Sequence, residues 1–330
     1  MSNAVGKTVL VTGGAGFIGS HTCQALLRSG FDVTCVDNFC DFYDPGIKKE
    51  NVREIEETAK AENRRFRLFQ IDIRDCSLLS EAFDYERPYA VIHLAACAGV
   101  RPSIDNPALY TEVNVNGSLN VLECMKSRLI KKLLFASSSS VYGCSEKVPF
   151  SEEDIVDRPI SPYAATKRAG ELFCHTYHHL YGINAACLRL FTVYGPRQRP
   201  DLAVYKFTKL ILDGKKLPFF GDGSSKRDYT YIDDIVDGIM KALEWVGGSG
   251  KRYGIFNLGQ SNTVSLSQML ETIERSLGKK AVLDRRGNQP GDVPITCADI
   301  THSREVLGYD PKTDFETGCR SFLEWFREKL

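Results

Sequence analysis

Tyr163 and Lys167 lie four residues apart in the segment SPYAATK, a spacing at which both side chains share one face of a helix. A lysine cation close to a phenol favours the phenolate and lowers the phenol pKa from about 10 toward neutrality. Tyr163 could then accept a proton as a general base at physiological pH. Taken alone, such a pair is more often an ordinary pair on a helix surface, so this interpretation depends on what surrounds it.

A run of four serines at residues 137–140 follows an apolar stretch and is the second group suited to chemistry. Ser138 could hydrogen-bond the same substrate hydroxyl that Tyr163 deprotonates and share its proton. The alternative for this run is a polar loop with no chemical role. The two segments predict catalysis only in combination with a cofactor site, and the N-terminal residues supply the pattern of one.

Three glycines, Gly13, Gly16 and Gly19, lie between an apolar run and a helix-like stretch. They permit a tight turn and close approach of the backbone to a pyrophosphate, and the helix N-terminus offers N–H donors to the phosphates. Asp37 ends the next apolar run, where a carboxylate accepts hydrogen bonds from ribose hydroxyls and repels a 2′-phosphate. Because no arginine follows Asp37 directly, the pattern predicts NAD as the cofactor; the alternative for Asp37 is a helix cap.

The elements that must position these groups alternate along the first half of the chain. Apolar runs typical of strands alternate with amphipathic stretches typical of helices, which predicts an α/β fold with a doubly wound parallel Rossmann sheet. We expect an NAD-binding domain at residues 1–194, joined by part of 228–258, and a smaller α/β substrate-binding domain at residues 195–330. The predicted strands are residues 8–12, 32–36, 66–71, 90–94, 132–137 and 185–191, and the predicted helices include residues 18–29 and 110–127.

The charge balance gives no reason to expect a polyanionic partner. Lys and Arg number 42, as do Asp and Glu, so the formal net charge is zero and neither nucleic acid nor an anionic membrane is expected. No apolar stretch approaches the length of a membrane span, and the strand pattern begins by Thr8, which leaves no room for a targeting segment. The 11 dispersed cysteines, none spaced as C-x-x-C, are typical of reduced thiols in the cytoplasm.

The Gly-x-x-Gly-x-x-Gly spacing, together with the serine, tyrosine and lysine described above, resembles the extended short-chain dehydrogenase/reductase family. The resemblance implies that Asp72 and Ile73 flank the adenine of NAD and that Asn114 braces the nicotinamide half. It implies Ser138, Tyr163 and Lys167 as the catalytic residues. The implied cofactor site comprises Gly13, Gly16, Phe17, Ile18, Gly19, Asp37, Asn38, Asp72, Ile73, Leu94, Ala95, Ala96, Asn114, Tyr163 and Lys167.

Within that family the chain resembles UDP-glucuronate 4-epimerases over nearly its whole length, most clearly in residues 37–45, 93–101 and 189–201. The resemblance implies that Tyr163 removes the proton of a sugar hydroxyl while hydride passes from the same carbon to NAD⁺. The resulting ketone would turn over and receive hydride on its other face. The implied reaction converts UDP-glucuronate to UDP-galacturonate, with tightly bound NAD regenerated in each cycle.

Positions 139, 140 and 192 separate branches of the family. Sugar 4,6-dehydratases carry an Asp-Glu pair where this chain has Ser139 and Ser140, and UDP-glucuronate decarboxylases carry Glu at the second position. UDP-galactose 4-epimerases usually carry Asn in place of Thr192. Small hydroxyls at these positions suit hydrogen bonds to a substrate carboxylate, with Arg199 nearby. They could hold that carboxylate out of the alignment in which a β-keto acid loses CO₂.

Arg227 and Asp292 are candidates for binding the nucleotide. A guanidinium at Arg227 could pair with the diphosphate as a fork, and Asp292 could bond the nucleotide ribose or brace Arg227, although both could instead form surface ion pairs. His175 and His179 share a helix face but imply no acid partner, so no metal is expected. The resemblance further implies a homodimer built from the helices around residues 110–127 and 163–181.

Other functions stay open on the sequence. UDP-glucose differs from UDP-glucuronate at C6, and UDP-N-acetylglucosamine differs from it at C6 and C2, so a 4-epimerase of either sugar is the first alternative. A UDP-glucuronate decarboxylase is less consistent with the serine run. A non-catalytic NAD-binding sensor could keep the glycine loop, but retention of Ser138, Tyr163 and Lys167 together argues against it.

Overall fold

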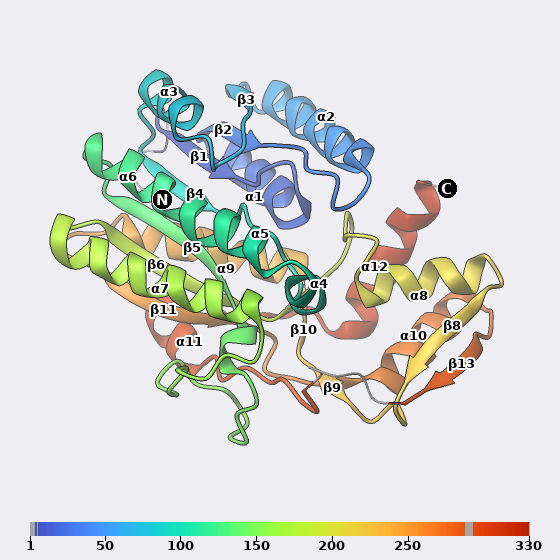
Figure 1. The fold of residues 1–330 in the computed structure, drawn as a ribbon. Helices are drawn as coiled ribbons and strands as arrows, with labels where there is room; N and C mark the ends of the chain where they lie inside the picture. The colour runs from blue at the N-terminus through green and yellow to red at the C-terminus, as the bar shows by residue number, and fades with distance from the viewer. Residues whose placement is uncertain (1–3, 5, 288–292, 330) are drawn as a thin grey trace.

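A seven-stranded parallel sheet forms the centre of the molecule, in the strand order β11-β6-β5-β4-β1-β2-β3 (Figure 1). The computed structural model describes residues 4, 6–287 and 293–329. Parallel neighbours require crossover connections, which explains why helices alternate with these strands. The order reverses between β1 and β4, and such a switch point is where doubly wound sheets bind ligands. The strands are β1 (Thr8–Thr12), β2 (Asp32–Asp37), β3 (Phe66–Gln70), β4 (Ala90–His93), β5 (Lys132–Ser138), β6 (Asn184–Leu190) and β11 (Tyr253–Leu258).

Helices cover both faces of the sheet. In Figure 1, α6 and α7 lie in front of the sheet and α9 lies behind it. Helix α9 packs on β5, β6 and α1, and α1 packs on α2, whereas α7 packs on β5, β6 and α6, and α6 on α3. The bounds of these helices are α1 (Phe17–Arg28), α2 (Pro45–Ala61), α3 (Cys76–Glu86), α6 (Gly117–Ser127), α7 (Pro162–Tyr181) and α9 (Ile232–Val246).

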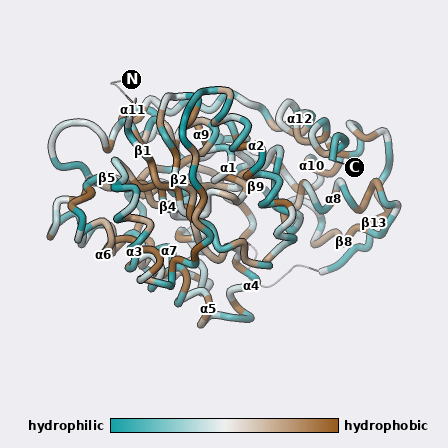
Figure 2. The backbone as a smooth tube through the Cα atoms, turned by 90° about the horizontal axis from the view of Figure 1, so that it is seen from above, coloured by the Kyte–Doolittle hydropathy of each residue, from teal (hydrophilic) through white to brown (hydrophobic). Residues whose placement is uncertain are grey.

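The central strands are buried because their side chains pack on both faces. All five residues of β1 are buried; Val9 and Val11 belong to the hydrophobic core on one face and Leu10 to the core on the other. Figure 2 shows the hydrophobic residues gathered along the central strands. Strands buried on both faces read as continuous apolar runs, which is why the sequence indicated them.

The predicted Rossmann fold is confirmed, and each of the six predicted strands lies within one residue of an observed one. The sequence did not indicate β11, which follows α9 and pairs with β6 at the edge of the sheet. Residues 232–258 thus return to the central sheet after the chain has left it. The division into domains at residue 195 stays a prediction.

Most of the remaining elements form a smaller part beside the sheet, on the right in Figure 1, whereas α11 packs on β11 and α9. Its strands pair in twos, as β10-β7, β12-β9 and β13-β8. None of the helices in the described ranges has the length and apolar content needed to cross a bilayer. The elements are β7 (Thr192–Tyr194), α8 (Ala203–Leu212), β8 (Lys216–Phe220), β9 (Lys226–Arg227), β10 (Tyr229–Tyr231), β12 (Val264–Ser265), α10 (Leu266–Leu277), β13 (Val282–Arg286), α11 (Thr301–Leu307) and α12 (Phe315–Glu328).

The long helix predicted at residues 110–127 is interrupted. After α4 (Val100–Asp105), the structure has a short helix α5 (Pro107–Thr111), then a π-helical turn η1 (Glu112–Asn116), then α6. Turns of this kind are rare and are frequent at functional sites. The interruption contains Asn114, a predicted cofactor residue, and changes the direction in which that side chain leaves the helix.

Candidate active site

The glycine loop closes tightly on the end of β4. Gly13 has φ +70°, and a Cβ built on it would lie 2.8 Å from the backbone nitrogen of Ala95. A Cβ on Gly19 would lie 2.1 Å from the Gly13 carbonyl oxygen. Gly16 is the N-cap of α1 and supplies no side-chain cap to the first amides of the helix. The loop therefore suits a pyrophosphate, since the backbone can approach it and the amides can donate to it.

Gly13→Ala is expected to abolish NAD binding while the chain still folds, because the new methyl group would displace the loop from Ala95. The measurement is NAD content of the purified protein, by absorbance after acid release, beside circular dichroism. Gly182→Ala is the matched control, because Gly182 also has positive φ but a Cβ there meets no neighbour within 4 Å. A Gly13→Ala protein with full NAD content would contradict the assignment of this loop.

Asp37 is buried at the end of β2 and oriented by three donors. Its carboxylate accepts from the backbone nitrogens of Ala15 (3.3 Å) and Phe39 (2.9 Å) and from Lys48 Nζ (3.0 Å). Lys48, on α2, is itself buried, so the two charges form a buried ion pair. The sequence did not indicate this lysine, because nothing in its spacing shows that α2 turns it toward β2. A carboxylate held this way keeps lone pairs for ribose hydroxyls, as the predicted role requires.

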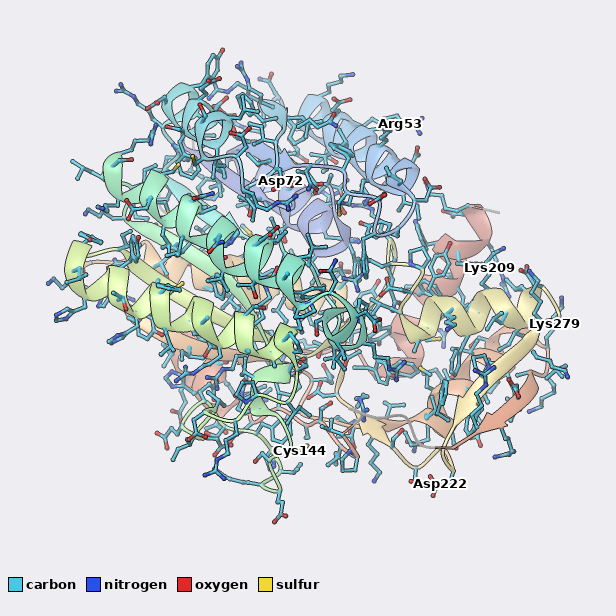
Figure 3. All side chains as sticks on the ribbon, in the orientation of Figure 1. Arg53, Asp72, Cys144, Lys209, Asp222 and Lys279 are labelled. Carbon is cyan, nitrogen blue, oxygen red and sulfur yellow. The ribbon has the colours of Figure 1, made fainter. Side chains whose placement is uncertain are left out.

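Two residues predicted to bind the adenosine half lie together beyond β2 and β3. Asn38 Nδ2 donates to Asp72 Oδ2 over 2.9 Å. The Arg74 guanidinium, by hydrogen bonding Asp72, lowers the pKa of that carboxyl to about 2, so Asp72 is ionised at neutral pH. Figure 3 shows Asp72 among the helices around the sheet, whereas Asp222 lies in the smaller part. Ile73 is buried against Gly117 of α6, so it serves packing as well as the predicted cofactor site.

The segment after β4 is held from both sides. Ala95 donates its backbone N–H to Thr12 Oγ1 (3.2 Å), next to the glycine loop. Asn114 accepts from the Cys97 backbone nitrogen (2.8 Å) and donates to the Cys97 carbonyl (3.0 Å) and to Thr166 Oγ1 (3.0 Å). Asn114 thus ties residues 94–97 to α7, the helix of the catalytic pair. Leu94, Ala95 and Ala96 are partly exposed there, and Phe17 and Ile18 begin α1.

His93, the last residue of β4, is neutral at physiological pH. Its Nε2 lies 2.8 Å from Ser118 Oγ, which donates to the Asn114 carbonyl; Ser118 therefore accepts from Nε2–H, and Nδ1 accepts from Thr12 Oγ1 (2.6 Å). Burial, and less strongly the charge of Lys167, lowers the pKa of His93 from 6.5 to about 3. The neutral imidazole of His93 thus links β4 to β1 and to α6, next to the predicted cofactor site.

His93→Gln is expected to weaken the pH dependence of stability. As pH falls below 6.5 the unfolded chain protonates His93 but the native chain does not until about 3, so stability declines through this window. His21, whose pKa burial also lowers to about 3, acts in the same way. Each of the two histidines contributes at most about 1.4 kcal/mol per pH unit to the slope of stability against pH, so the variant should lose about half of their combined contribution. Urea unfolding across the window measures it; exposed His179→Gln should keep the wild-type slope, and an unchanged His93→Gln slope would contradict the prediction.

The three predicted catalytic residues meet at the carboxyl end of β5. Tyr163 lies in the first turn of α7, partly exposed, and hydrogen bonding with Ser138 acts to lower its pKa. Lys167 lies one turn further along α7 and is buried, with Nζ 5.9 Å from the centre of the Tyr163 ring. Ser161 caps the helix by accepting from the Ala164 backbone nitrogen, which places Tyr163 at the helix start.

The electrostatics of this group differ from the expectation. Burial raises the pKa of Tyr163, and the nearby charge that acts to lower it is that of Arg199, not Lys167. Lys167 Nζ donates to the Ala136 carbonyl over 2.8 Å, and burial lowers the pKa of Lys167 to about 8. Lys167 therefore remains largely protonated at neutral pH, although it forms no ion pair with a carboxylate among the described residues. It is poised to donate to a ligand, as the predicted bond to the nicotinamide ribose requires.

A buried network behind the serine run holds it in place. Ser137 Oγ donates to Glu171 Oε1 (2.6 Å), and Glu171 forms a fork with Arg189 (2.8 and 3.0 Å). The Arg189 guanidinium lies 4.8 Å from the centre of the Tyr142 ring, and the Tyr142 hydroxyl donates to Asn257 Oδ1 (2.7 Å). This network was not predicted from the sequence. The signal was that Glu171 lies on α7 one turn beyond Lys167, so it faces the sheet with the catalytic pair.

The predicted carboxylate-binding hydroxyls surround the same strand ends. Ser139 and Ser140 form the turn after β5, partly exposed, and Ser140 Oγ lies 3.1 Å from Ser138 Oγ. Thr192 begins β7, two residues beyond Leu190, which pairs with Ser138 in the sheet. The carboxyl ends of neighbouring strands thus bring the three hydroxyls to one edge, although the structure records no direct bond from Thr192 to the serines.

Arg199 is the cation of this site. Its guanidinium forms a fork with Asp201 (2.9 and 2.8 Å) and lies 5.4 Å from the centre of the Phe42 ring. Its charge acts to lower the pKa of both Tyr163 and Tyr43, and its contact with Phe42 places it beside the loop after β2. Asp201 as its partner was not predicted. An anionic substrate group would compete with Asp201 for the fork.

Arg227 lies in β9 and its Nη1 donates to the carbonyl of Lys226 (2.8 Å). Its predicted partner Asp292 lies outside the described residues, so the pairing is untested. The neighbour that organises this strand is Asp228, which the sequence analysis missed. Asp228 is buried and accepts from the backbone nitrogens of Gln260 (2.7 Å), Ser261 (3.0 Å) and Ala298 (3.0 Å). Within the described ranges, no group of three His, Cys, Asp or Glu residues could hold a metal ion.

The fold and the site are those of an extended short-chain dehydrogenase/reductase that binds a dinucleotide beside a Ser-Tyr-Lys group. Residues 10–322 match the family described as GDP-mannose 4,6 dehydratase, and the chain belongs to that family. The predicted family is thereby confirmed.

Within this family the chain is similar to UDP-glucuronate 4-epimerases. It is 44% identical to the UDP-glucuronate 4-epimerase of Thermodesulfobacterium geofontis over 322 residues, covering 97% of this chain and 96% of that protein. A crystal structure of the UDP-glucuronic acid 4-epimerase from Bacillus cereus, in complex with UDP-glucuronic acid and NAD, superposes with a TM-score of 0.89 at 36% identity, covering 98% of this chain and all (100%) of that one. The structure of the UDP-glucose 4-epimerase of Thermotoga maritima with UDP-glucose superposes with a TM-score of 0.87 at 34% identity. The superposition covers 98% of this chain and 99% of that one.

Proposed function

We propose that the protein is an NAD-dependent isomerase that converts UDP-glucuronate to UDP-galacturonate by inverting the hydroxyl at C4. The observation that carries this proposal is the combination of Tyr163, Lys167 and Ser138 with two serines where dehydratases carry an acid pair. Without those acids the site has no groups to eliminate water across C5–C6. The similarity to UDP-glucuronate 4-epimerases over nearly the whole chain supports the same reaction.

Tyr163 is the general base that removes the proton from the C4 hydroxyl. Ser138, its hydrogen-bond partner, holds the same hydroxyl and steadies the proton between the two oxygens. Lys167 bonds the nicotinamide ribose, and the cation of Arg199 favours the phenolate. After the sugar has turned, Tyr163 returns the proton to the ketone oxygen as hydride arrives on the opposite face, so the residues end each cycle as they began it.

The residues around the glycine loop fit NAD. Gly13, Gly16 and Gly19 leave room for the pyrophosphate, and Asp37 faces the ribose hydroxyls with an acid that disfavours a 2′-phosphate. NAD⁺, when bound, would supply a hydride acceptor for C4 and a positive charge that further favours the Tyr163 phenolate. Because Asn114 ties the β4 exit to α7, the cofactor pocket and the catalytic tyrosine keep a fixed separation.

The substrate carboxylate is held by Ser139, Ser140, Thr192 and Arg199. The 4-keto form of a uronic acid loses CO₂ when its C5–C6 bond aligns with the carbonyl π system. Hydrogen bonds from several hydroxyls and a guanidinium fork fix the carboxylate out of that alignment. Arg227 binds the diphosphate, and Asp292 bonds the nucleotide ribose or braces Arg227.

A 4-epimerase of UDP-glucose is the second candidate, supported by the similarity to the Thermotoga maritima enzyme. The cation at Arg199 favours the uronate, because a C6 carboxylate can compete with Asp201 for that guanidinium and a neutral C6 hydroxyl competes far less well. A C4-deuterated UDP-glucuronate tests the proposal. We expect the deuterium at C4 of the UDP-galacturonate product, because one bound cofactor takes and returns the same hydride. Product without the label would rule out this mechanism, and absence of conversion would rule out the substrate.

The protein acts as a homodimer in the cytoplasm. Leu172 and Leu180 on α7 are large apolar side chains that are more than half exposed (53% and 59%), and a second copy would cover them. All 11 cysteines are free thiols, as is usual in a reducing compartment. Light scattering of the purified protein should give twice the chain mass, and Leu172→Glu/Leu180→Glu should give the single chain mass.

A further inference from the structure

We infer that Arg197 is a positioning residue that fixes Arg199 in the site by tying residues 195–201, here called the strap, to α1 and α2. This inference rests on the proposed function and adds a residue to it. The strap leaves the end of β7 and leads to α8. Two of its arginines, two positions apart, reach in different directions.

Arg197 reaches between α1 and α2 and is buried, with 8% of its surface exposed. On α1 its guanidinium donates to Ser20 Oγ (3.2 Å) and Gln24 Oε1 (2.7 Å). On α2 it forms an ion pair with Glu54 Oε2 (2.5 Å). A guanidinium with three partners on two helices has one allowed orientation, which a lysine ammonium could not reproduce.

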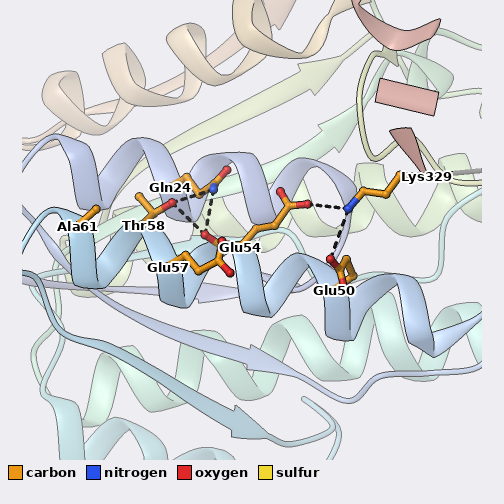
Figure 4. A pocket seen from close by; sticks show the side chains of 7 residues that line it. All are labelled: Gln24, Glu50, Glu54, Glu57, Thr58, Ala61 and Lys329. Carbon is orange, nitrogen blue, oxygen red and sulfur yellow. Dashed lines mark hydrogen bonds and ion pairs between the residues drawn. The ribbon is translucent and has the colours of Figure 1, made fainter. Parts of the chain in front are cut away.

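The partners of Arg197 are themselves held. Gln24 Nε2 donates to Thr58 Oγ1 (2.8 Å) and to the Glu54 carbonyl (3.2 Å), so its amide oxygen is turned toward Arg197. Figure 4 shows Gln24, Thr58 and Glu54 converging along an open groove, with Lys329 reaching Glu54 from the C-terminal end. The groove therefore lies on the solvent side of the contacts between the strap, α1 and α2. Arg197 balances the charge of Glu54 from the interior of the protein.

The backbone of the strap is strained at the same residue. Arg197 has φ +64°, a left-handed conformation that a residue with a Cβ adopts at a cost. Such a conformation persists only where its surroundings enforce it, and here the side-chain bonds to α1 and α2 do so. A second bond secures the strap, between the Pro196 carbonyl and Nε2 of the partly buried, neutral His21 (3.0 Å).

Arg199 lies two residues further on and faces the site. Its charge acts on Tyr163 and Tyr43, and its fork holds Asp201. Because α1 also presents its N-terminus to the glycine loop, Arg197 sets the distance between the cofactor loop and the substrate-facing guanidinium. Loss of the Arg197 contacts should let the Arg199 guanidinium move away from the substrate carboxylate. It should not remove any group that contacts NAD or the sugar.

The test is Arg197→Lys in the NAD-bound enzyme. Lysine keeps the positive charge, but its ammonium group cannot reproduce the planar guanidinium contacts with Ser20, Gln24 and Glu54. We expect kcat with UDP-glucuronate to fall about ten- to hundredfold, as for a misplaced positioning group, and the share of turnovers that end in CO₂ release to rise several-fold. NAD content and the melting temperature should remain close to wild type. Glu54→Gln, a milder change at the same contacts, should shift the CO₂ share in the same direction.

Lys329→Ala is the matched control, because Lys329 contacts the same Glu54 from an exposed position and should change neither number. Unchanged kcat and CO₂ share in both Arg197→Lys and Glu54→Gln would overturn the inference. So would a loss of activity that only follows loss of NAD or of folded protein. Wild-type enzyme inactive on UDP-glucuronate would instead overturn the proposed function, which separates the two failures.

Discussion

Tyr163→Phe should lower kcat for UDP-glucuronate epimerisation by about 10²- to 10⁴-fold, the range that a positioned general base contributes. The ring remains, so the edge-to-face packing on Tyr110, with centroids 6.2 Å apart, should persist. What disappears is the hydroxyl whose pKa the hydrogen bond with Ser138 and the charge of Arg199 act to lower. NAD content and substrate affinity should therefore change little, and the loss should appear in kcat rather than in KM.

Tyr110→Phe is the matched control for this variant. Tyr110 lies against Tyr163, but its hydroxyl donates to the Ala98 carbonyl over 2.8 Å and has no place in the proton transfer. Its removal should reduce kcat less than about fivefold, on the order of one lost hydrogen bond. If Tyr163→Phe retained a tenth or more of wild-type kcat, Tyr163 would not be the base.

The double variant Ser139→Ala/Ser140→Ala should turn the epimerase partly into a decarboxylase. Each hydroxyl that bonds a charged carboxylate contributes about 1.5–3 kcal/mol, so losing both should raise CO₂ release per turnover by about tenfold or more. Oxidation at C4 should continue, because Ser138, Tyr163 and Lys167 are unchanged. NMR of the products should show a UDP-pentose signal that grows as UDP-galacturonate declines.

Ser145→Ala serves as the control, since Ser145 lies just beyond the same turn and its backbone nitrogen, not its hydroxyl, bonds Tyr142. It should leave the ratio of the products as in wild type. A double variant that binds UDP-glucuronate normally and releases no extra CO₂ would show that Ser139 and Ser140 do not orient the carboxylate.

The parts of the site that the sequence predicted are those encoded by short spacings. The glycine loop, Asp37 at a strand end and the pair Tyr163 and Lys167 each depend on neighbours within a few residues, so local pattern and strand periodicity locate them. The central strands were equally clear, because burial on both faces makes them continuously apolar. Strand β11 was missed, since its partner β6 is distant in the chain and nothing local marks it as an edge strand.

The residues that orient the site residues and balance their charges contact them only through tertiary packing. The local sequence therefore does not indicate them. Lys48 faces Asp37 only because α2 packs beside β2, and Arg189 meets Glu171 only because β6 lies under α7. The predicted effect of Lys167 on Tyr163 illustrates the limit. Their spacing correctly placed them on one face, but burial raises the pKa of Tyr163, and a charge that acts to lower it belongs to Arg199, 36 residues further along the chain.

Product analysis by NMR with purified protein and no added NAD tests the central claim most directly. UDP-glucuronate and UDP-glucose would be incubated separately with the same preparation. UDP-galacturonate should form from the first, sustained over many turnovers by bound NAD, and UDP-galactose should form from the second far more slowly. UDP-galactose as the main product would contradict the role given to Arg199 and the serines, and UDP-pentose from UDP-glucuronate would contradict the claim that they prevent decarboxylation.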